Sequence, residues 1–328
     1  MDMVVEKNDD VDINFETDPL TPRIVDNKWL MATGTSLGAD NGIGIATCFA
    51  ILEDKSLRHG PLEVLVTRDE ETGMFGATDL EPGVLKAKYM INVDSEEENA
   101  ICIGCSGGFT VHMTLPTVRQ SVSNHVLSRI TLNNFCGGHS GCDIDLGRAN
   151  PLQVMGRLVA ATSTDLRVID VTCGTADNAI PRKCVMDVAV PQEQQETFSK
   201  QLQAAFDAFY KEYRTIETAA TIDVTPLDET PSKAPLSLEE SCRLVSFLAI
   251  CPFGVQRYSP AVMRDVETSM TCAIARSSSE SVTFIASVRS SSNSQMDMMY
   301  AKLRCLCNMC GMQLSERKAP YSFDGGLM

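Results

Sequence analysis

The chain has 328 residues, of which 44% are hydrophobic and 22% charged, a composition typical of globular proteins with room for two domains. Its 28 Lys and Arg residues against 43 Asp and Glu residues give a net charge of −15. Binding to a nucleic-acid backbone needs clustered cations, so this balance argues against nucleic acid as a partner. No apolar run approaches the length of a membrane-spanning helix, and the first residues are too acidic for a secretory signal, so we expect no membrane partner.

The 13 cysteines lack the regular spacing of secreted, disulfide-linked domains, and most of them lie in apolar stretches. We therefore expect reduced thiols in a cytoplasmic protein. Two Cys-x-x-Cys pairs, Cys102 with Cys105 and Cys307 with Cys310, could together form a structural zinc site. Because the two pairs lie far apart in the sequence, buried reduced cysteines are the preferred interpretation.

Residues 1–106 have the pattern of an α/β domain. The predicted elements, in chain order, are a helix at 42–52, a strand at 62–67, a short turn and helix at 72–80 and a strand at 89–93. Both strands are continuous apolar runs, which are typical of strands covered on both faces of a sheet. We expect a mixed sheet flanked by helices, with functional groups just beyond the ends of its strands.

From residue 107 the pattern changes to alternating apolar and polar residues, which predicts antiparallel strands with one solvated face. The predicted elements up to residue 235 are strands at 109–115 and 126–132, helices at 152–162 and 192–218, and a loop at 223–235. A Ser-x-x-Glu capping box at 237–240 begins another helix, and strands at 268–276 and 281–288 and a helix at 293–312 follow it. We therefore predict an inserted α+β domain at 107–312, between an incomplete first domain at 1–106 and the start of its second half at 313–328.

Three acidic clusters, at Asp40, at Glu70 and Glu71, and at Asp94, each follow an apolar run and are flanked by glycine or small residues. Carboxylates near glycine are most often turn formers or helix caps, and for any one cluster that is the more frequent explanation. Three of them in order, each beside a predicted element, favour a site for divalent metal, which prefers oxygen ligands. A bridging Asp could hold two ions about 3.5–4 Å apart, while a neighbouring Glu accepts a proton from metal-bound water.

Seven strings occur in order along the chain: TSLGADNGIGIA at 35–46, RDEETGMFGA at 68–77, INVDSEEENAICIGCSGG at 91–108, GGHSGCDIDLGRANP at 137–151, DNAIPR at 177–182, VETSM at 266–270 and SVRSS at 287–291. In these strings the chain resembles the aminoacyl-histidine dipeptidases (cytosol nonspecific dipeptidases), a branch of the zinc-dependent carboxypeptidase and aminoacylase metallopeptidases. The likeness runs from Asp2 to about Pro320. It implies part of a catalytic α/β domain, an inserted lid domain that forms a homodimer, and hydrolysis of dipeptides of the Xaa-His type or of broad specificity.

The resemblance also implies a metal site. Asp40 would bridge two divalent ions, with Zn²⁺ expected first and Co²⁺ or Mn²⁺ possible, and its bond to Asn41 would be a cis peptide. Glu71 would bind one ion and Asp94 the other. These roles come from the family pattern and are expectations for this chain.

The remaining roles are implied in the same way. Asp2 would orient a metal ligand, and Glu70 would be the general base and proton shuttle. His139, in the lid, would stabilise the oxyanion of the tetrahedral intermediate across the dimer. Asn178 and Arg289 would hold the substrate, with the Arg289 guanidinium paired to its C-terminal carboxylate.

Two histidine ligands of the family pattern have no counterpart here. One would precede residue 1 and the other would follow the lid, while His59, His112 and His125 lie in unsuitable contexts. Each ion would then keep only carboxylate ligands, so we expect weak metal binding and weak or absent hydrolysis by the chain as written. The alternative is an inactive truncated copy that acts as a dimerisation or regulatory partner through its lid.

Overall fold

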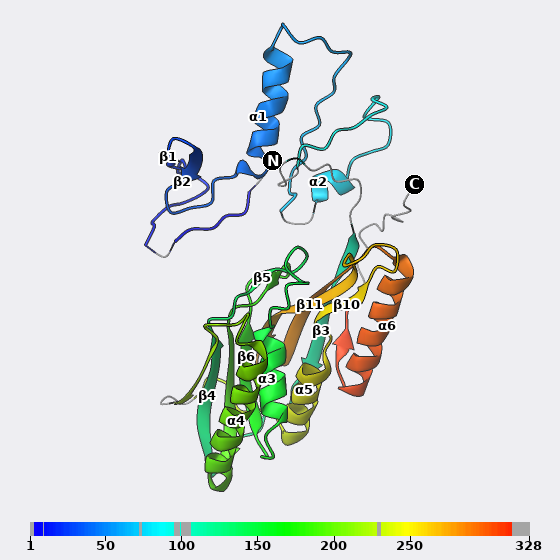
Figure 1. The fold of residues 1–328 in the computed structure, drawn as a ribbon. Coiled ribbons are helices and arrows are strands. Elements are labelled where there is room, and N and C mark those ends of the chain that lie inside the picture. Colours follow the sequence, from blue (N-terminus) through cyan, green and yellow to red (C-terminus); the bar gives the residue numbers. More distant parts are fainter. Residues whose placement is uncertain are drawn as a thin grey trace. The chain divides into compact units, whose positions relative to one another are not determined.

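The computed structural model describes residues 3–8, 10–71, 74–94, 99, 106–227 and 231–316. The chain divides into two compact units, Met1–Cys102 and Ile103–Met328 (Figure 1). The mixed α/β fold class predicted from the sequence is confirmed. In the part of the chain that is described, no helix has the length and apolar character needed to cross a membrane.

The first unit contains a hairpin and two helices. Strand β1 (Pro22–Val25) pairs antiparallel with β2 (Trp29–Ala32), and α1 (Ala39–Glu53) and the single turn of α2 (Phe75–Thr78) follow. The helices predicted at 42–52 and 72–80 are confirmed. The hairpin is absent from the prediction. Its loop is residues 26–28, in which the N–H of Lys28 donates to the carbonyl of Val25 at 3.0 Å and the two central residues of this β-turn, Asp26 and Asn27, both have positive φ.

The strands predicted at 62–67 and 89–93 are wrong for this structure. A strand exists only through backbone hydrogen bonds to a neighbour, and within the described residues neither segment has such a ladder. The side chain of Glu63 instead accepts the backbone N–H groups of Lys86 and Ala87, at 2.9 and 2.7 Å. The apolar residues of the second segment are largely exposed, 91% for Tyr89 and 86% for Ile91. An apolar run therefore predicts a buried strand only where a partner strand is in place.

The second unit is built on a nine-stranded antiparallel sheet with the order β13-β3-β12-β11-β6-β8-β4-β9, and β10 pairs with β11. The strands are β3 (Gly107–Pro116), β4 (His125–Asn133), β6 (Arg167–Cys173), β8 (Cys184–Pro191), β9 (Thr221–Pro226), β10 (Gly254–Tyr258), β11 (Val266–Ser277), β12 (Ser281–Ser290) and β13 (Gln313–Leu314). The predicted strands at 109–115, 126–132, 268–276 and 281–288 are confirmed. In β12 every second residue is buried, which is the alternation of a sheet with one face toward the core.

Four helices pack against this sheet: α3 (Pro151–Ala160), α4 (Gln195–Tyr213, after the 3-10 turn Gln192–Gln194), α5 (Leu238–Ile250) and α6 (Asn293–Met309). They correspond to the helices predicted at 152–162, 192–218, 237 onward and 293–312. The ribbon view shows α3, α4, α5 and α6 running along the sheet (Figure 1). Their apolar faces and the inner face of the sheet share one core, which includes Met155, Phe198, Phe247, Phe284 and Leu303.

Five strands of this sheet depart from the prediction, and two of them, β10 and β13, are short strands that it lacks. Strand β9 falls partly in the predicted loop at 223–235, and β6 and β8, in the middle of the sheet, are absent from the prediction. Strand β9 lies at the sheet edge, where charged residues such as Asp223 and a terminal Pro226 are tolerated because one side needs no partner. Loop composition and edge-strand composition are therefore easily confused.

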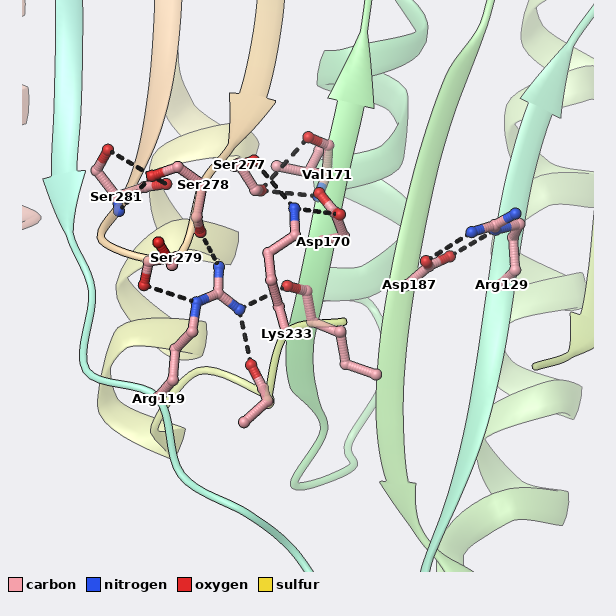
Figure 2. A network of polar contacts seen from close by, with 12 residues as sticks. Arg119, Arg129, Asp170, Val171, Asp187, Lys233, Ser277, Ser278, Ser279 and Ser281 are labelled. Carbon is pink, nitrogen blue, oxygen red and sulfur yellow. Dashed lines mark hydrogen bonds and ion pairs between the residues drawn. The ribbon is translucent and has the colours of Figure 1, made fainter. Parts of the chain in front are cut away.

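Charged side chains join the segments of this sheet, as Figure 2 shows. The Arg119 guanidinium donates hydrogen bonds to four backbone carbonyls, those of Ile169, Ala234, Ser278 and Ser279, at 2.6–3.1 Å. Lys233 pairs with Asp170, and Arg129 on β4 pairs through two nitrogens with Asp187 on β8 at 2.7 and 2.8 Å. Arg129 and Asp187 are register partners, so this ion pair follows from the strand alignment.

Candidate active site

A tight turn in the second unit holds the predicted oxyanion donor. Short strand β5 (Gly138–His139) pairs with β7 (Ala179–Ile180), and the chain then turns sharply at 139–143. The backbone N–H of Asp143 donates to the carbonyl of His139 at 3.0 Å, and the N–H of His139 donates to Oδ2 of Asp143 at 2.9 Å. The two reciprocal bonds close the turn around His139.

The same turn fixes the imidazole ring of His139. Its Nδ1 atom accepts the backbone N–H groups of Gly141 at 3.2 Å and of Cys142 at 3.0 Å. A ring nitrogen that accepts hydrogen bonds carries no proton, so the neutral ring has its proton on Nε2. The ring of His139 can therefore present an N–H donor through Nε2, which is what stabilisation of an oxyanion requires.

Asn178 and Arg289 reach the same place from two other parts of the chain. The backbone N–H of Ser140 donates to the carbonyl of Asn178 at 2.8 Å, next to the β5–β7 pairing. A side chain on Gly141 would lie only 3.1 Å from the ring carbon Cε1 of His139 and 3.4 Å from Nε of Arg289. Glycine at 141 thus lets the imidazole and the guanidinium approach each other.

Arg289 is held in place by the sheet and keeps one donor unused. It lies near the end of β12, in register with Gly108 on β3 and Ser269 on β11. Its Nε atom is buried and has no hydrogen-bond partner among the described residues. A buried donor without a partner is costly, and a bound anionic group would satisfy it. The arrangement suits a carboxylate beside the ring of His139.

The predicted carboxylates of the first unit do not form a comparable cluster. The cis peptide expected between Asp40 and Asn41 is present, and Asp40 lies at the start of α1. Asp40, Glu70, Glu71 and Asp94 are all exposed. In the residues that the structure describes, no three His, Cys, Asp or Glu side chains are close enough to hold a metal ion. The carboxylates present do not, as arranged, fit a metal site, and Asp2 lies outside the described residues.

The cysteines bear on the structural zinc alternative. Cys307 and Cys310 are buried free thiols in and after α6, whereas Cys102 and Cys105 lie outside the described residues. Burial, and to a smaller extent Cys251 and Cys310 nearby, raises the pKa of Cys307 to about 12. A thiol with such a pKa stays protonated at neutral pH.

Three residues of the site are absent from the sequence interpretation. Asp143 and Arg148 form an ion pair inside the loop that carries His139, with Arg148 Nη1 3.0 Å from Asp143 Oδ2. Glu217, which is fully buried, accepts the N–H of Cys136 at 2.7 Å and of Ala149 at 2.8 Å. Asp143 and Arg148 lie in the string at 137–151 that carries the family resemblance, and this position was the sequence signal by which they could have been identified. Nothing local marks Glu217.

Comparison with known proteins connects these features to a protein family. The model of the M20 peptidase dimerisation domain matches residues 130–216. The cytosol non-specific dipeptidase of Escherichia coli (strain K12) is 36% identical over 326 residues, which cover 98% of this chain and 66% of that protein. The crystal structure of aminoacylhistidine dipeptidase from Vibrio alginolyticus superposes with a TM-score of 0.76 at 36% identity, covering 97% of this chain and 65% of the other. The chain thus spans just under two thirds of the length of each relative.

Proposed function

The chain belongs to the M20 peptidases, in the branch of the cytosol non-specific dipeptidases, and from this membership we propose that it acts in metal-dependent hydrolysis of dipeptides. We propose further that residues 107–312 are a lid that binds the substrate and mediates a homodimer, and that the protein is cytoplasmic. The dimerisation domain matched at 130–216 and the name of the Escherichia coli relative support these points.

The unused Nε donor of Arg289 beside the ring of His139 is the observation that carries the proposal. In a dipeptide only one residue separates the peptide carbonyl from the terminal carboxylate. One small site can therefore bind the carboxylate through Arg289 and place the carbonyl oxygen near Nε2 of His139. Asn178, beside the same turn, is the third proposed substrate contact. In a longer peptide only the last peptide bond has the terminal carboxylate at this distance, so the contact with Arg289 selects the bond before the C-terminal residue.

For the metal we propose Zn²⁺ first, with Asp40, Glu71 and Asp94 as ligands, Glu70 as proton acceptor and Asp2 as an orienting residue. The family supports this assignment, and carboxylate oxygens are ligands of a kind that divalent ions accept. Because the described carboxylates are not clustered as a metal site, we derive no catalytic step through the ion. The weak turnover expected from the sequence stays a prediction.

The proposal is tested by hydrolysis of a dipeptide panel that includes Xaa-His substrates. The purified chain is treated with a chelator and then supplied with Zn²⁺, Co²⁺ or Mn²⁺. We expect hydrolysis only with added metal, and its loss in Glu70→Gln, which keeps the size of the side chain but cannot accept the proton. Hydrolysis unchanged by chelation would contradict the metal dependence. Dipeptide binding without any turnover would favour the alternative of an inactive partner that binds through its lid.

A further inference from the structure

The loop that carries His139 is closed at two levels. At its base, the Glu217 carboxylate accepts the backbone N–H groups of Cys136 and Ala149, the residues at either end of the loop. Inside the loop, Arg148 Nη1 donates to the carbonyl of Gly137 at 2.6 Å and to Oδ2 of Asp143 at 3.0 Å. The inner contacts therefore join Arg148, near the end of the loop, to Gly137 and Asp143 on either side of His139 in the chain.

The ion pair of Asp143 and Arg148 also contacts the backbone of His139. Oδ2 of Asp143, the atom that accepts from Arg148, also accepts the backbone N–H of His139 at 2.9 Å. Gly138 precedes His139 with a φ of 140°, and a side chain there would overlap both Asp143 and Arg148. Asp143 and Arg148 thus occupy the space that a side chain at position 138 would fill. Arg148 contacts the main chain at Gly137, and Asp143 contacts it at His139.

We propose that Asp143 and Arg148 are positioning residues for His139. They hold its main chain so that Nδ1 meets the N–H groups of Gly141 and Cys142, which keeps the ring proton on Nε2 and aims that donor at the substrate site. The consequence for catalysis depends on the proposed dipeptidase function, whereas the geometry of the ring does not.

The surroundings of the Asp143–Arg148 pair distinguish a role in positioning His139 from a general role in stabilising the folded unit. The side chains of Arg148 and Asp143 are 26% and 29% exposed, and their contacts to Gly137 and His139 lie within this loop and outside the apolar core of the unit. Loss of either side chain should therefore change the ring of His139 much more than it changes thermal unfolding.

The test uses nitrogen-15 NMR of the imidazole rings in the full chain, above the ordinary pKa of histidine. The chain has 4 histidines, so the spectrum is simple, and His139→Gln identifies the signals of His139. In the wild type we expect a single Nε2–H tautomer for His139. In Asp143→Ala and Arg148→Ala we expect averaged signals of two tautomers for this ring, with the other three histidines unchanged. Asp143→Asn, which keeps an acceptor for the N–H of His139, should restore most of the wild-type signal.

The matched control is Arg157→Ala, which removes another partly exposed arginine ion pair of this unit, that with Glu212. It should leave the ring of His139 unchanged. An unaltered Nε2–H tautomer in both Asp143→Ala and Arg148→Ala overturns the proposal, and so does an averaged tautomer in the wild type. If either alanine variant does not fold, Asp143→Leu and Arg148→Met decide through the same signals, because they keep the bulk of the side chains and remove the contacts to the His139 N–H and the Gly137 carbonyl.

Activity separates this proposal from the proposed function. Where the wild type hydrolyses dipeptides, the alanine variants should lose at least about tenfold in kcat with little change in KM, because the oxyanion donor acts in the transition state. A wild type that shows the expected tautomer, and variants that lose it, would support the positioning role even if no dipeptide is hydrolysed. Full kcat in a variant with a disturbed ring would overturn the catalytic consequence alone.

Discussion

The buried carboxylate of Glu217 connects the two ends of the loop that carries His139. It is 0% exposed, and each of its oxygens accepts one backbone N–H, from Cys136 and from Ala149. The same carboxylate also affects the thiol of Cys136. The pKa of this thiol is raised, first by burial and second by the nearby Glu217. Both ends of the loop that carries His139 therefore depend on a residue that follows α4 in the chain.

We expect Glu217→Gln to destabilise the protein by roughly 1–3 kcal/mol, since the amide offers one acceptor where two N–H groups need one each, and a buried donor is left unsatisfied. Urea unfolding followed by circular dichroism measures this. The control is Glu212→Gln, whose side chain is 52% exposed and pairs with Arg157. Equal unfolding midpoints for the two variants would contradict the role of Glu217.

Local signals in the sequence predict single elements well and their pairing poorly. The capping box of α5 is present as predicted, with the side chain of Ser237 accepting the N–H of Glu240. Strands with alternating patterns, such as β3 and β12, were also predictable because one face of each meets the core. Whether an apolar run finds a partner is not a local property. The runs at 62–67 and 89–93 therefore predict strands that the structure lacks.

At the start of α5 we expect Ser237→Ala to cost about 1 kcal/mol, the usual effect of losing an N-cap side chain. Glu240→Ala should cost more, because its carboxylate also accepts the N–H of Val118 at 3.0 Å and so connects α5 to the chain after β3. Thermal and urea unfolding measure the loss of stability in both variants, and Glu239→Ala, at an exposed neighbouring residue, is the control. A Glu240→Ala protein as stable as Glu239→Ala would refute it.

Across the whole molecule, the parts of the predicted site differ in how far the structure assembles them. His139, Asn178 and Arg289 come together because strand pairing and register carry them to one turn. The family motifs indicated these three residues without their geometry, and the contacts of Gly141, which let two of them meet, required the structure. The roles of the exposed Asp40 and Asp94 stay predictions, since their motifs indicate a metal site and no group of three possible metal ligands occurs among the residues that the structure describes.

The central claim is that the second unit binds the free carboxylate of a dipeptide through Arg289, beside His139. Isothermal titration calorimetry with a dipeptide and with its C-terminal amide, on the wild type and on Arg289→Ala, tests it without requiring turnover. A charged hydrogen-bonded contact of this kind is worth roughly 1.5–3 kcal/mol, so we expect the wild type to bind the free acid about ten- to a hundredfold more tightly than the amide. In Arg289→Ala the two ligands should bind alike. Equal affinities for acid and amide in the wild type, or a preference that survives in Arg289→Ala, would contradict the claim.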